Sequence, residues 1–403
     1  MNKLLQLLPI LILICVRLVQ HQLSSNNLSP ISFNLPQLPE FKPDNRLVNV
    51  PIERIGEDDL VYPESFVLSP DEKYAFISLG DGRIIRIDGP KEENINWLSL
   101  GRTGNVGEDM SKQCGKGGPA DLNNMEEFCG RPLGMYYNED DDTLLVADAY
   151  KGFIKVSNLY SKAKMYTLAT RAISDSEDYT FNLLNAVVKV PSGDIYLTET
   201  SRQFKRRRIF YAAMDGRATG RLLRYKHDTG VVEVVANNIF MPNGMTLSHD
   251  EKHLFIVSGV QILTFDIESQ QFETPFVTVM PGTGDNIKAM NELPNGKKMK
   301  CYYAALGGTY KQPFSLLHFL SDKPWLRSLI LAIVPYTKII DLIPKWTALA
   351  VFNEEGELIE TLSDDGTQVE YPWLSEMEPV GDYMYLSSWY NPFLARIKRQ
   401  DFQ

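Results

Sequence analysis

Oxygen-bearing side chains recur at one position of a repeated sequence unit. In the stretch 281–290, PGTGDNIKAM, an acid and an amide stand side by side directly before a predicted strand. The residues at this position in the successive units are Glu64, Leu133, Asn185, Asn243, the pair Asp285 and Asn286, and Ser375. Carboxylates mixed with amide carbonyls are ligands that calcium prefers. If these positions converge in space, they predict a calcium site. Its ligands would be Glu64, Asn185, Asn243, Asp285 and Asn286.

A simpler interpretation, turn capping, and a different metal, zinc, compete with a calcium site. Asp and Asn commonly cap turns where strands begin, so a single position of this kind would indicate only turn chemistry. Oxygen donors at the same position of four units favour the metal. Zinc is disfavoured because none of the five histidines lies at these positions.

The elements that would position these side chains repeat along the body of the chain. Each unit has a short apolar stretch, a turn of Pro, Asp, Gly or Asn, and strongly β-forming stretches separated by a second turn. The units begin at Phe66, Met135, Ala186, Met245, Ile287 and Glu376. These meanders predict an all-β fold, a six-bladed β-propeller, because neighbouring blades bury the faces that one small sheet cannot bury alone. A pair of β-sandwiches is the structural alternative.

In a propeller the first strand of each blade is the innermost. One residue at the start of that strand in every blade would therefore face the central tunnel at a similar height. We expect Leu133, Tyr150, Ser375 and Trp389 to line a pocket at the tunnel mouth. The two aromatic side chains also fit an ordinary place in the core.

The N-terminal residues 1–20 predict entry into the secretory pathway. Their apolar run from Leu4 to Val16 has the length of a signal-peptide core and is short for a membrane-spanning helix, which needs about twenty apolar residues. Arg17 follows directly, and no clear small-x-small cleavage motif comes after it. A cleaved signal peptide, giving a secreted protein, and an uncleaved signal-anchor with a lumenal or extracellular body both stay open.

Further segments divide the rest of the chain. Residues 21–45, rich in Ser, Asn and Pro, predict a linker, and 46–403 form the propeller domain. Asn27 stands in a glycosylation sequon that a following proline weakens. The stretch 314–346 is helical and too apolar for an ordinary solvent-facing helix. We expect it to pack over one end of the propeller, with a membrane-contacting amphipathic surface as the alternative.

The four cysteines predict one disulfide. Cys114 and Cys129 bracket a Gly- and Asn-rich loop, and in an oxidising compartment a disulfide there would stabilise the fold by about 3 kcal/mol in the chain-entropy model. Cys15 lies in the leader, and Cys301 is left unpaired in a predicted strand. A cysteine metal site is disfavoured because the sequence has no C-x-x-C pair.

Net charge excludes one class of partner. The chain carries a formal charge of −10 and has a pI of about 5.2, which argues against a general nucleic-acid binder. The one basic run, KRRR at Lys205 to Arg208, predicts a solvated loop.

Several segments resemble the strictosidine synthase-like family. They are FCGRPLGMYY, VADAYKGFIKV, the span from FNLLNAVV through YLTETS to GRLLRY, MPNGMTLS and DKPWLRSLI. The likeness runs over most of the chain from about Leu47 onward and is strongest to the animal branch that contains adipocyte plasma membrane-associated protein and hemomucin. It implies a six-bladed propeller, often on an N-terminal membrane anchor, and it agrees with a disulfide at the paired cysteines.

The resemblance also implies what this chain lacks. Strictosidine synthase joins an amine to an aldehyde with a glutamate from the last blade, and the matching position here is Ser375, which cannot act as that acid or base. The wider superfamily of paraoxonases and regucalcin includes calcium-dependent lactonases and esterases, whose calcium shell looks similar to the ligand set predicted above. A paraoxonase histidine near the metal aligns with Leu133. A true strictosidine synthase is therefore not expected.

We expect a calcium-dependent hydrolase of small-molecule esters or lactones, similar to an arylesterase. The ion would polarise a carbonyl oxygen and stabilise the developing oxyanion. Asp285 is the first candidate for the base that activates water. Glu199 is the second, although it also fits a structural pairing with an arginine. The alternative is a non-catalytic extracellular or lumenal binding protein whose calcium only ties the blades together, and the loss of both familiar catalytic residues favours it.

Overall fold

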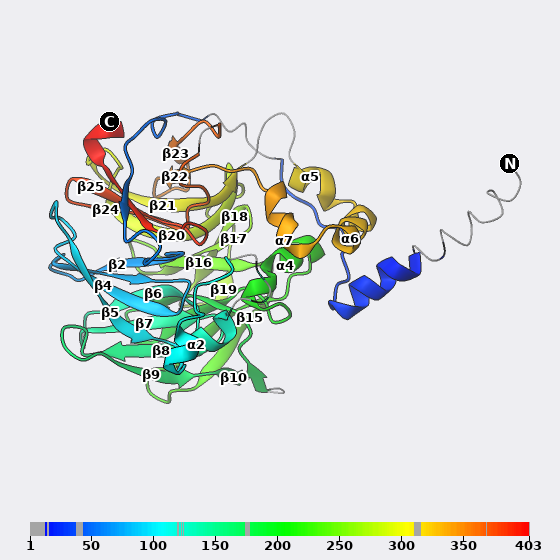
Figure 1. Cartoon of the computed structure of the whole chain (residues 1–403), viewed down its shortest axis with the longest axis horizontal. Coiled ribbons are helices and arrows are strands. Elements are labelled where there is room, and N and C mark those ends of the chain that lie inside the picture. The colour runs from blue at the N-terminus through cyan, green and yellow to red at the C-terminus, as the bar shows by residue number, and fades with distance from the viewer. Residues whose placement is uncertain are drawn as a thin grey trace, which may run out of the picture.

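The structure is a computed structural model. It describes residues 13, 16–37, 43–118, 121, 123, 125–173, 178–309, 316–367 and 369–402. Within these residues the chain folds into six sheets arranged as the blades of a propeller (Figure 1). The predicted six-bladed β-propeller is therefore confirmed, and the pair of β-sandwiches is excluded. We number the blades 1 to 6 in chain order.

The first three blades follow one another along the chain. Blade 1 contains β2 (Phe66–Leu68), β3 (Tyr74–Ser78), β4 (Arg83–Asp88) and β5 (Asn96–Arg102). Blade 2 contains β6 (Pro132–Asn138), β7 (Thr143–Asp148), β8 (Gly152–Ser157) and β9 (Lys164–Ala169). Blade 3 contains β12 (Leu184–Lys189), β13 (Ile195–Glu199), β14 (Gly220–Tyr225) and β15 (Val232–Ile239), and is extended by β10 (Arg171–Ile173) and β11 (Asp178–Thr180).

The other three blades complete the ring. Blade 4 contains β16 (Pro242–Leu247), β17 (His253–Ser258), β18 (Gln261–Asp266) and β19 (Gln271–Phe272). Blade 5 contains β20 (Gly282–Glu292), β21 (Lys298–Thr309), β22 (Ala348–Phe352) and β23 (Leu358–Ser363). Blade 6 contains β24 (Glu376–Val380), β25 (Tyr383–Ser387) and β26 (Leu394–Lys398), and it takes its outer strand, β1 (Glu53–Ile55), from the other end of the domain.

Hydrophobic clusters join each blade to the next, which explains why the strands are apolar on both faces. Phe76 of blade 1 and Val146 of blade 2 belong to one such cluster. Phe66 of blade 1 packs against Tyr385 of blade 6, with ring centroids 4.8 Å apart. Similar clusters link the remaining neighbours around the ring. Each sheet buries both faces because two other sheets cover them.

The ring closes where β1 pairs antiparallel with β26. Arg396 on β26 is only 1% exposed. Its guanidinium donates hydrogen bonds to both carboxylate oxygens of Glu53 at 2.7 and 2.9 Å and to the carbonyl oxygen of Glu92 at 2.7 Å. Since Glu53 belongs to β1 and Glu92 to blade 1, Arg396 ties the last blade to both.

Apart from the helix at 16–25, the helices lie in loops between strands or, for the last of them, after β26. They are α2 (Glu108–Ser111), α3 (Glu126–Cys129), η1 (Arg206–Arg208), α4 (Ile209–Asp215), α5 (Leu316–Ser321), α6 (Pro324–Ile333), α7 (Tyr336–Ile339), η2 (Ile340–Leu342) and η3 (Arg399–Phe402). The helical insertion predicted in blade 5 is confirmed as α5 to η2. We call this insertion, together with α4, the helical cap.

The helical cap packs over one end of the propeller, as expected for the insertion. Phe210 of α4 lies against Tyr336 of α7 with ring centroids 5.6 Å apart, and against Trp389 of blade 6 at 6.1 Å. Leu331 of α6 belongs to the same hydrophobic cluster. The sequence did not predict α4, because the basic run at 205–208 that directly precedes it resembled a solvated loop.

The N-terminal segment is attached to the helical cap. The backbone N–H of Ile31 donates to the carbonyl oxygen of Asp215 at 3.0 Å, and that of Phe33 donates to the carbonyl oxygen of Ser321 at 3.1 Å. These hydrogen bonds fix a part of the chain that was expected to be a linker over 21–45. The linker prediction is corrected for this part.

The leader is described only in part. Residues 16–25 are helical, while residues 1–12 and 14–15, which hold most of the apolar run, lie outside the described residues. In the described part of the chain no helix is long and apolar enough to cross a membrane. The signal peptide or signal-anchor and glycosylation at Asn27 stay predictions.

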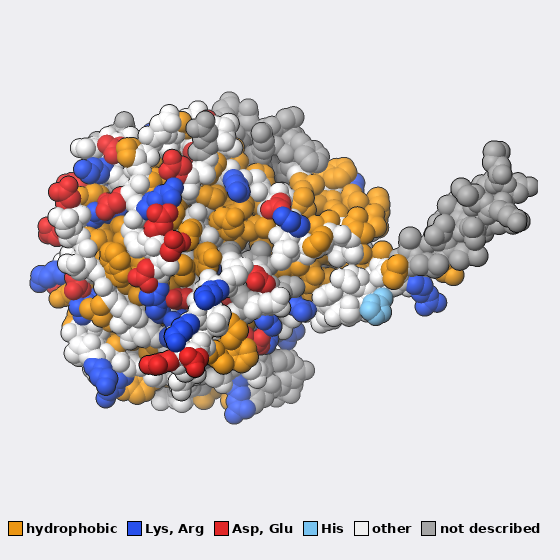
Figure 2. All heavy atoms as spheres, in the orientation of Figure 1, with side chains coloured by type: hydrophobic (Ala, Val, Ile, Leu, Met, Phe, Trp, Pro, Cys, Tyr) orange, Lys and Arg blue, Asp and Glu red, His pale blue; other side chains and the backbone are white. Residues whose placement is uncertain are grey.

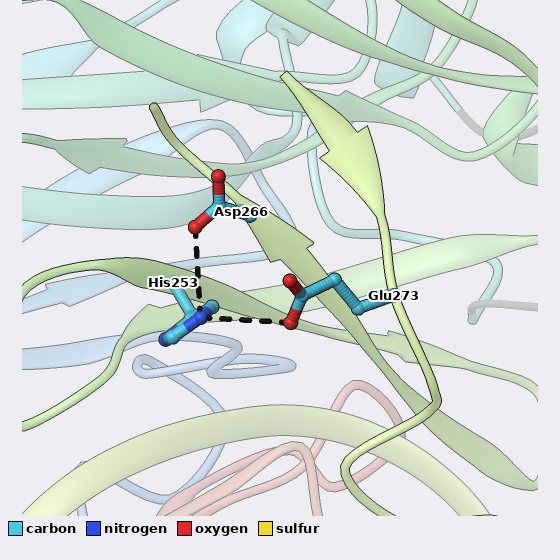
Figure 3. Close-up of side chains that lie close together, drawn as sticks. All are labelled: His253, Asp266 and Glu273. Atoms are coloured by element: carbon cyan, nitrogen blue, oxygen red, sulfur yellow. Dashed lines mark ion pairs between the residues drawn. The ribbon is translucent and has the colours of Figure 1, made fainter. Parts of the chain in front are cut away.

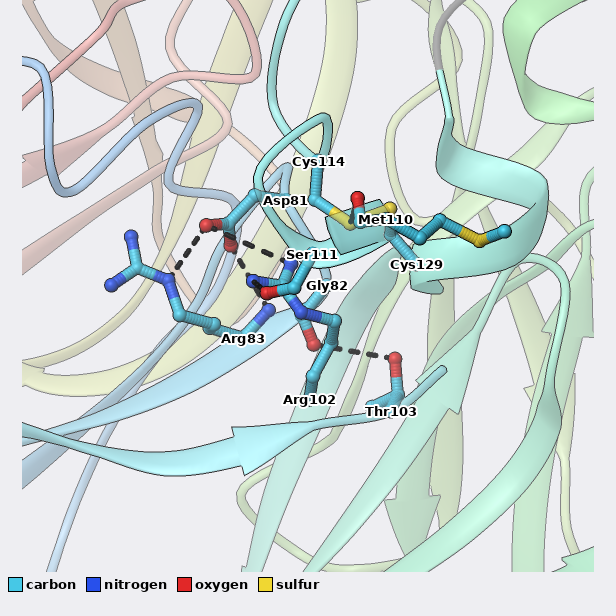
Figure 4. Close-up of a disulfide and its surroundings, with 9 residues drawn as sticks. All are labelled: Asp81, Gly82, Arg83, Arg102, Thr103, Met110, Ser111, Cys114 and Cys129. Carbon is cyan, nitrogen blue, oxygen red and sulfur yellow. Dashed lines mark hydrogen bonds and ion pairs between the residues drawn. A yellow bond between two sulfur atoms is a disulfide. The ribbon is translucent and has the colours of Figure 1, made fainter. Parts of the chain in front are cut away.

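The predicted disulfide and the unpaired Cys301 are confirmed, whereas Cys15 lies outside the described residues. Cys114 and Cys129 form a disulfide, with their Cα atoms 5.9 Å apart (Figure 4). The carbonyl oxygen of Cys129 also accepts the backbone N–H of Gly104 at 2.9 Å, so the cross-linked loop is held against the end of blade 1. Cys301 is a free, buried cysteine on β21.

Replacing Arg396 by Met should loosen the closure of the ring. We expect the free energy of unfolding to fall by about 2–3 kcal/mol, because several buried hydrogen bonds are lost. Urea denaturation measures the change. Arg54→Met on β1 is the matched control: its ion pair with Glu57 is exposed on both sides and should contribute no more than about 1 kcal/mol. Equal stability of the two variants would contradict this role of Arg396.

Candidate functional site

The predicted ligand positions of four blades share a β-bulge. The pairing of the first strand with the second shifts register between Pro132 and Met135, Leu184 and Val187, Pro242 and Met245, and Gly284 and Ile287. Inside these bulges lie Leu133, Asn185, Asn243, and the pair Asp285 and Asn286. A bulge interrupts the ladder and re-aims the side chains within it. The candidate ligand positions are therefore structurally equivalent in blades 2 to 5. The sequence suggested this equivalence, and the shared bulge shows it.

Two glycines let these positions approach one another. A Cβ on Gly244 would lie 2.4 Å from the Cα of Asn286, and a Cβ on Gly134 would lie 2.6 Å from the carbonyl oxygen of Asn185. Any side chain would push the strands apart. The glycines of PLG and PNG thus bring the inner strand of one blade against the ligand position of the next.

Asp285 lies at the electrostatic centre of the site. Its side chain is 6% exposed, and burial together with repulsion from Glu64 raises its pKa well above the usual range, although hydrogen bonds from Asn243 and Ser375 oppose the shift. The Oδ1 atom of Asn243 is buried and has no hydrogen-bond partner in the described part of the chain. Buried acceptors of this kind are normally satisfied. An unpaired carbonyl oxygen beside two repelling carboxylates fits a bound cation.

Glu64 is fixed by a buried arginine. Nη2 of Arg131 lies 2.7 Å from Oε2 of Glu64, and both side chains are almost fully buried. Nη1 of Arg131 donates to the carbonyl oxygen of Tyr62 at 3.2 Å. Burial and the nearby charge of Arg206 lower the pKa of Arg131. The pair orients Glu64 at the start of blade 1 toward the other ligand positions.

A second arginine comes from η1. Arg206 is 7% exposed, and its Nη1 lies 3.3 Å from Oε1 of Glu126, whose Oε2 accepts the Tyr150 hydroxyl at 2.9 Å. Burial alone would lower the pKa of Arg206, but the negative charges of Glu126 and Glu64 outweigh burial and raise this pKa overall. The guanidinium therefore stays charged. The prediction that residues 205–208 form a solvated loop was wrong for Arg206, because α4 holds η1 against the tunnel mouth.

Carboxyl groups outnumber guanidinium groups in this cluster at the mouth. The carboxylates of Glu64, Glu126 and Asp285 interact with the guanidinium groups of Arg131 and Arg206 as one electrostatic group. If all three acids were ionised, they would exceed the two guanidinium groups by one negative charge. Burying such a charge is costly, and a metal cation would balance it.

The expected pocket residues surround this group. Leu133 and Tyr150 lie in one apolar cluster with Leu183 and Ile209. Since Tyr150 also binds Glu126, this cluster borders the charged centre directly. No functional group of Leu133 can take part in proton transfer.

Ser375 and Trp389 border the centre from blade 6. The Ser375 hydroxyl donates to Asp285 and accepts the backbone N–H of Trp389 at 3.0 Å. The Trp389 ring lies 6.0 Å from the guanidinium of Arg206 and stacks on Trp373 with centroids 5.4 Å apart. Ser375 therefore positions the carboxyl of Asp285, and the Trp389 ring lies against Arg206.

The helical cap covers the centre in this conformation. All five predicted ligands have little or no exposed surface apart from Asn243, which is half-buried. Two cavities lie elsewhere, one of about 240 Å³ beside Val50 and Thr347 and one of about 550 Å³ beside Arg102 and Asn105. Access of a sizeable molecule to the centre therefore depends on movement of the cap.

Glu199, the second candidate base, is fully buried on β13. One carboxylate oxygen accepts the backbone N–H of Asn182 at 2.7 Å, and the other accepts Nε of Arg221 at 2.5 Å. Both oxygens are thus engaged in the interior of blade 3. The structure places Glu199 in a structural ion pair with an arginine, the simpler of its two interpretations.

A lysine closes the tunnel deeper along the same strands. Nζ of Lys288, on β20, lies 2.5 Å from Glu376 and 2.7 Å from Glu378, both on β24, and it also donates to the carbonyl oxygen of Phe66 on β2. Lys288 therefore ties blades 5, 6 and 1 together. Burial raises the pKa of Glu376 to about 7, against the attraction of Lys288. Neither glutamate lies free at the mouth, where it could replace the missing synthase glutamate.

A different group that could hold a metal lies on blade 4 (Figure 3). Nε2 of His253 is 3.6 Å from a carboxylate oxygen of Asp266 and 3.6 Å from one of Glu273. Sequence reasoning missed this group because pairing of β17 with β18 brings His253 opposite Asp266. An imidazole is not a ligand that calcium prefers, so this surface cluster is distinct from the centre at the tunnel mouth.

Three charged residues of the centre were not predicted. Arg131 directly precedes the PLG motif, which is the only sequence signal that could have drawn attention to it. Glu126 lies inside the disulfide loop, and Arg206 lies in the basic run. Their convergence depends on how three separate loops fold over the tunnel mouth.

Comparisons with known proteins agree with the resemblance. The family model for strictosidine synthase matches residues 185–264, which hold two of the predicted ligands. Adipocyte plasma membrane-associated protein from Gallus gallus is 30% identical over 379 residues, covering 92% of this chain and 83% of the relative. The Homo sapiens protein of the same name is 29% identical, with 92% and 83% covered. Strictosidine synthase-like 13 from Arabidopsis thaliana is 26% identical, with 79% and 76% covered.

Solved structures share the fold. A gluconolactonase from Xanthomonas campestris superposes with a TM-score of 0.52 at 13% identity, covering 92% of this chain and 97% of that structure. A second structure, described as a putative gluconolactonase, gives a TM-score of 0.50 at 11% identity, with 87% and 93% covered. At these identities the likeness establishes the propeller architecture.

Replacing Gly244 by Ala should separate the inner strands of blades 4 and 5. Because the new Cβ would overlap the backbone of Asn286, we expect a loss of about 1–3 kcal/mol in unfolding free energy and a lower melting temperature. Gly107→Ala is the control, since that position has a φ of −68° and nothing within 4 Å of the added carbon. Unchanged melting of the Gly244 variant would contradict the close approach.

Replacing Glu376 by Gln should flatten the dependence of stability on pH. The folded pKa of Glu376, about 7, lies above its ordinary value of 4.5, so the folded state holds a proton that the unfolded state releases. Stability from this group is present below pH 4.5 and is lost as pH rises through 7. We expect a smaller fall in melting temperature from pH 5 to 8 in the variant than in the wild type, and no difference for the exposed Glu355→Gln. Parallel curves for the Glu376 variant and the wild type would refute this.

Proposed function

Since the chain belongs to the strictosidine synthase-like family, which includes adipocyte plasma membrane-associated protein, we propose that its tunnel mouth binds calcium and hydrolyses small-molecule esters or lactones. The observation that carries the proposal is the buried, unpaired Oδ1 of Asn243 beside Asp285, whose carboxyl pKa is raised by burial and by Glu64. The residues that would hold the ion are Glu64, Asn185, Asn243, Asp285 and Asn286.

A bound calcium ion would supply the positive charge that polarises an ester carbonyl. The chain's own residues supply the rest. Asp285, oriented by hydrogen bonds from Asn243 and Ser375, would accept the proton of the attacking water. Arg206 stays charged beside it and would attract the carboxylate formed by hydrolysis. The helical cap would exclude bulk water and so strengthen each of these interactions.

The lining of the mouth favours an ester that carries an apolar or aromatic group. Leu133, Leu183 and the ring of Trp389 border the charged centre. An aryl ester would place its ring against these side chains and its carbonyl toward Asp285. This chemistry supports an arylesterase-like or lactonase-like substrate class.

The disulfide supports a place in the secretory pathway. Cys114 and Cys129 are bonded, and such bonds persist in oxidising compartments. We propose that the propeller faces the lumen or the extracellular space, either secreted or held by the N-terminal segment.

One observation favours a second function, a calcium-stabilised binding protein. The predicted ligands lie beneath the helical cap, and Ser375 and Leu133 bring no acid or base to the mouth. In that case the ion would only join the inner strands of the blades.

Chelation should abolish hydrolysis if the first function holds. Purified protein should cleave phenyl acetate, lose this activity in excess EGTA, and regain it when calcium is restored. Full activity in EGTA would exclude a role for the metal in catalysis. A folded, calcium-binding protein without measurable hydrolysis would favour the binding function.

Asn243→Ala separates the two functions further. Loss of calcium affinity and activity with little change in melting temperature indicates chemistry at the ion, whereas a large drop in melting temperature in a protein without activity indicates a structural ion. Isothermal titration with calcium and a thermal melt measure the two quantities. Asn105→Ala, at an exposed loop position, is the matched control and should leave both unchanged. Unchanged calcium binding in the Asn243 variant would contradict the assigned site.

A further inference from the structure

The outer face of the helical cap is apolar although it covers no other element of the described chain. Trp325 and Ile333 of α6 are each 67% exposed, and Leu329 between them is 40% exposed. Because these residues are four apart, they lie along one face of the helix. Phe319 of α5 adds a further exposed apolar side chain, at 44%. We call these four residues the outer apolar face.

This exposure does not come from a loosely attached helix. The opposite side of α6 buries Arg327 and Leu331. Arg327 donates to the carbonyl oxygen of Met214 at 2.8 Å, and its guanidinium lies 4.6 Å from the ring of Phe33. The helix is therefore firmly fixed by one face while the other presents a row of large apolar side chains to the surroundings. Figure 2 shows hydrophobic side chains gathered over this part of the molecule.

Charge distinguishes the insertion α5 to η2 from the rest of the chain. Residues 316–346 contain four basic residues, Lys323, Arg327, Lys338 and Lys345, and two acidic residues, Asp322 and Asp341, for a net charge of +2 against −10 for the whole chain. Tryptophan with flanking lysines is typical of surfaces that lie in the headgroup region of a bilayer. A second copy that docked through the same face would bring two positively charged segments together, which charge repulsion disfavours.

The path of the N-terminus leads to the same side of the molecule. Ile31 and Phe33 are hydrogen-bonded to the cap helices, and the helix at 16–25 projects from beside α4 and α6 (Figure 1). The apolar leader sequence precedes that helix. A leader held in a membrane would therefore keep the outer apolar face near the same bilayer.

We propose that the outer apolar face docks on a lipid bilayer, with Trp325, Leu329 and Ile333 inserted at the level of the headgroups and upper acyl chains. The helical cap would then have two faces with different partners. Its inner face covers the tunnel mouth, and its outer face binds the membrane surface. This inference does not depend on the hydrolase function.

Fluorescence quenching by brominated lipids tests the docking in the full chain. The leader alone could retain the protein on vesicles, so the measurement must report the depth of Trp325 rather than binding. With vesicles of phosphatidylcholine and phosphatidylserine brominated in the upper acyl chain, we expect quenching of tryptophan fluorescence in the wild type. Most of this quenching should disappear in Trp325→Phe, whereas Trp97→Phe, at a partly exposed tryptophan of blade 1, should retain it.

Two outcomes would overturn the proposal. Equal bromine quenching in the wild type and in Trp325→Phe would show that this face stays outside the bilayer. A doubled molecular mass in lipid-free solution that Trp325→Glu abolishes, without any bromine quenching of Trp325, would assign the face to a second copy of the chain instead.

Discussion

The buried repulsion between Asp285 and Glu64 is the constraint on which the centre depends. Asp285 belongs to blade 5 and Glu64 to the start of blade 1. The fold brings these two carboxyl groups together under the helical cap, where water screens their repulsion poorly. Arg131 and Arg206 offset part of this charge but also pair with Glu64 and Glu126. A cation shared by the inner strands, as proposed, would balance this charge and give the unpaired oxygen of Asn243 a partner.

The propeller creates this constraint through packing between blades. Each sheet buries its faces against its neighbours, so the inner strands must meet around one axis. Bulges at the start of those strands in blades 2 to 5, together with the glycines of PLG and PNG, then aim side chains at the mouth. The same architecture explains why Lys288 joins three blades deeper in the tunnel. The packing between blades that stabilises the fold therefore also brings the residues of the centre together.

The sequence predicted those features that repeat. Six meanders and their turns predicted the propeller, and the shared register of Asn185, Asn243 and Asp285 predicted the position of the candidate ligands. Features that occur once were missed, because no period reveals them. Arg206 resembled a solvated basic residue until α4 was seen to fold it inward, and His253 met Asp266 only through strand pairing. The Ser-, Asn- and Pro-rich composition of 21–45 predicted a linker. It could not reveal that the backbone of Ile31 and Phe33 is hydrogen-bonded to the helical cap.

The central claim is that a calcium ion occupies the axis at the tunnel mouth. Diffraction from crystals grown with terbium in place of calcium, at a wavelength where terbium scatters anomalously, tests it most directly. We predict an anomalous peak bonded to oxygens of Glu64, Asn243 and Asp285. A peak only at His253 and Glu273, or no peak within the tunnel at saturating metal, would contradict the account.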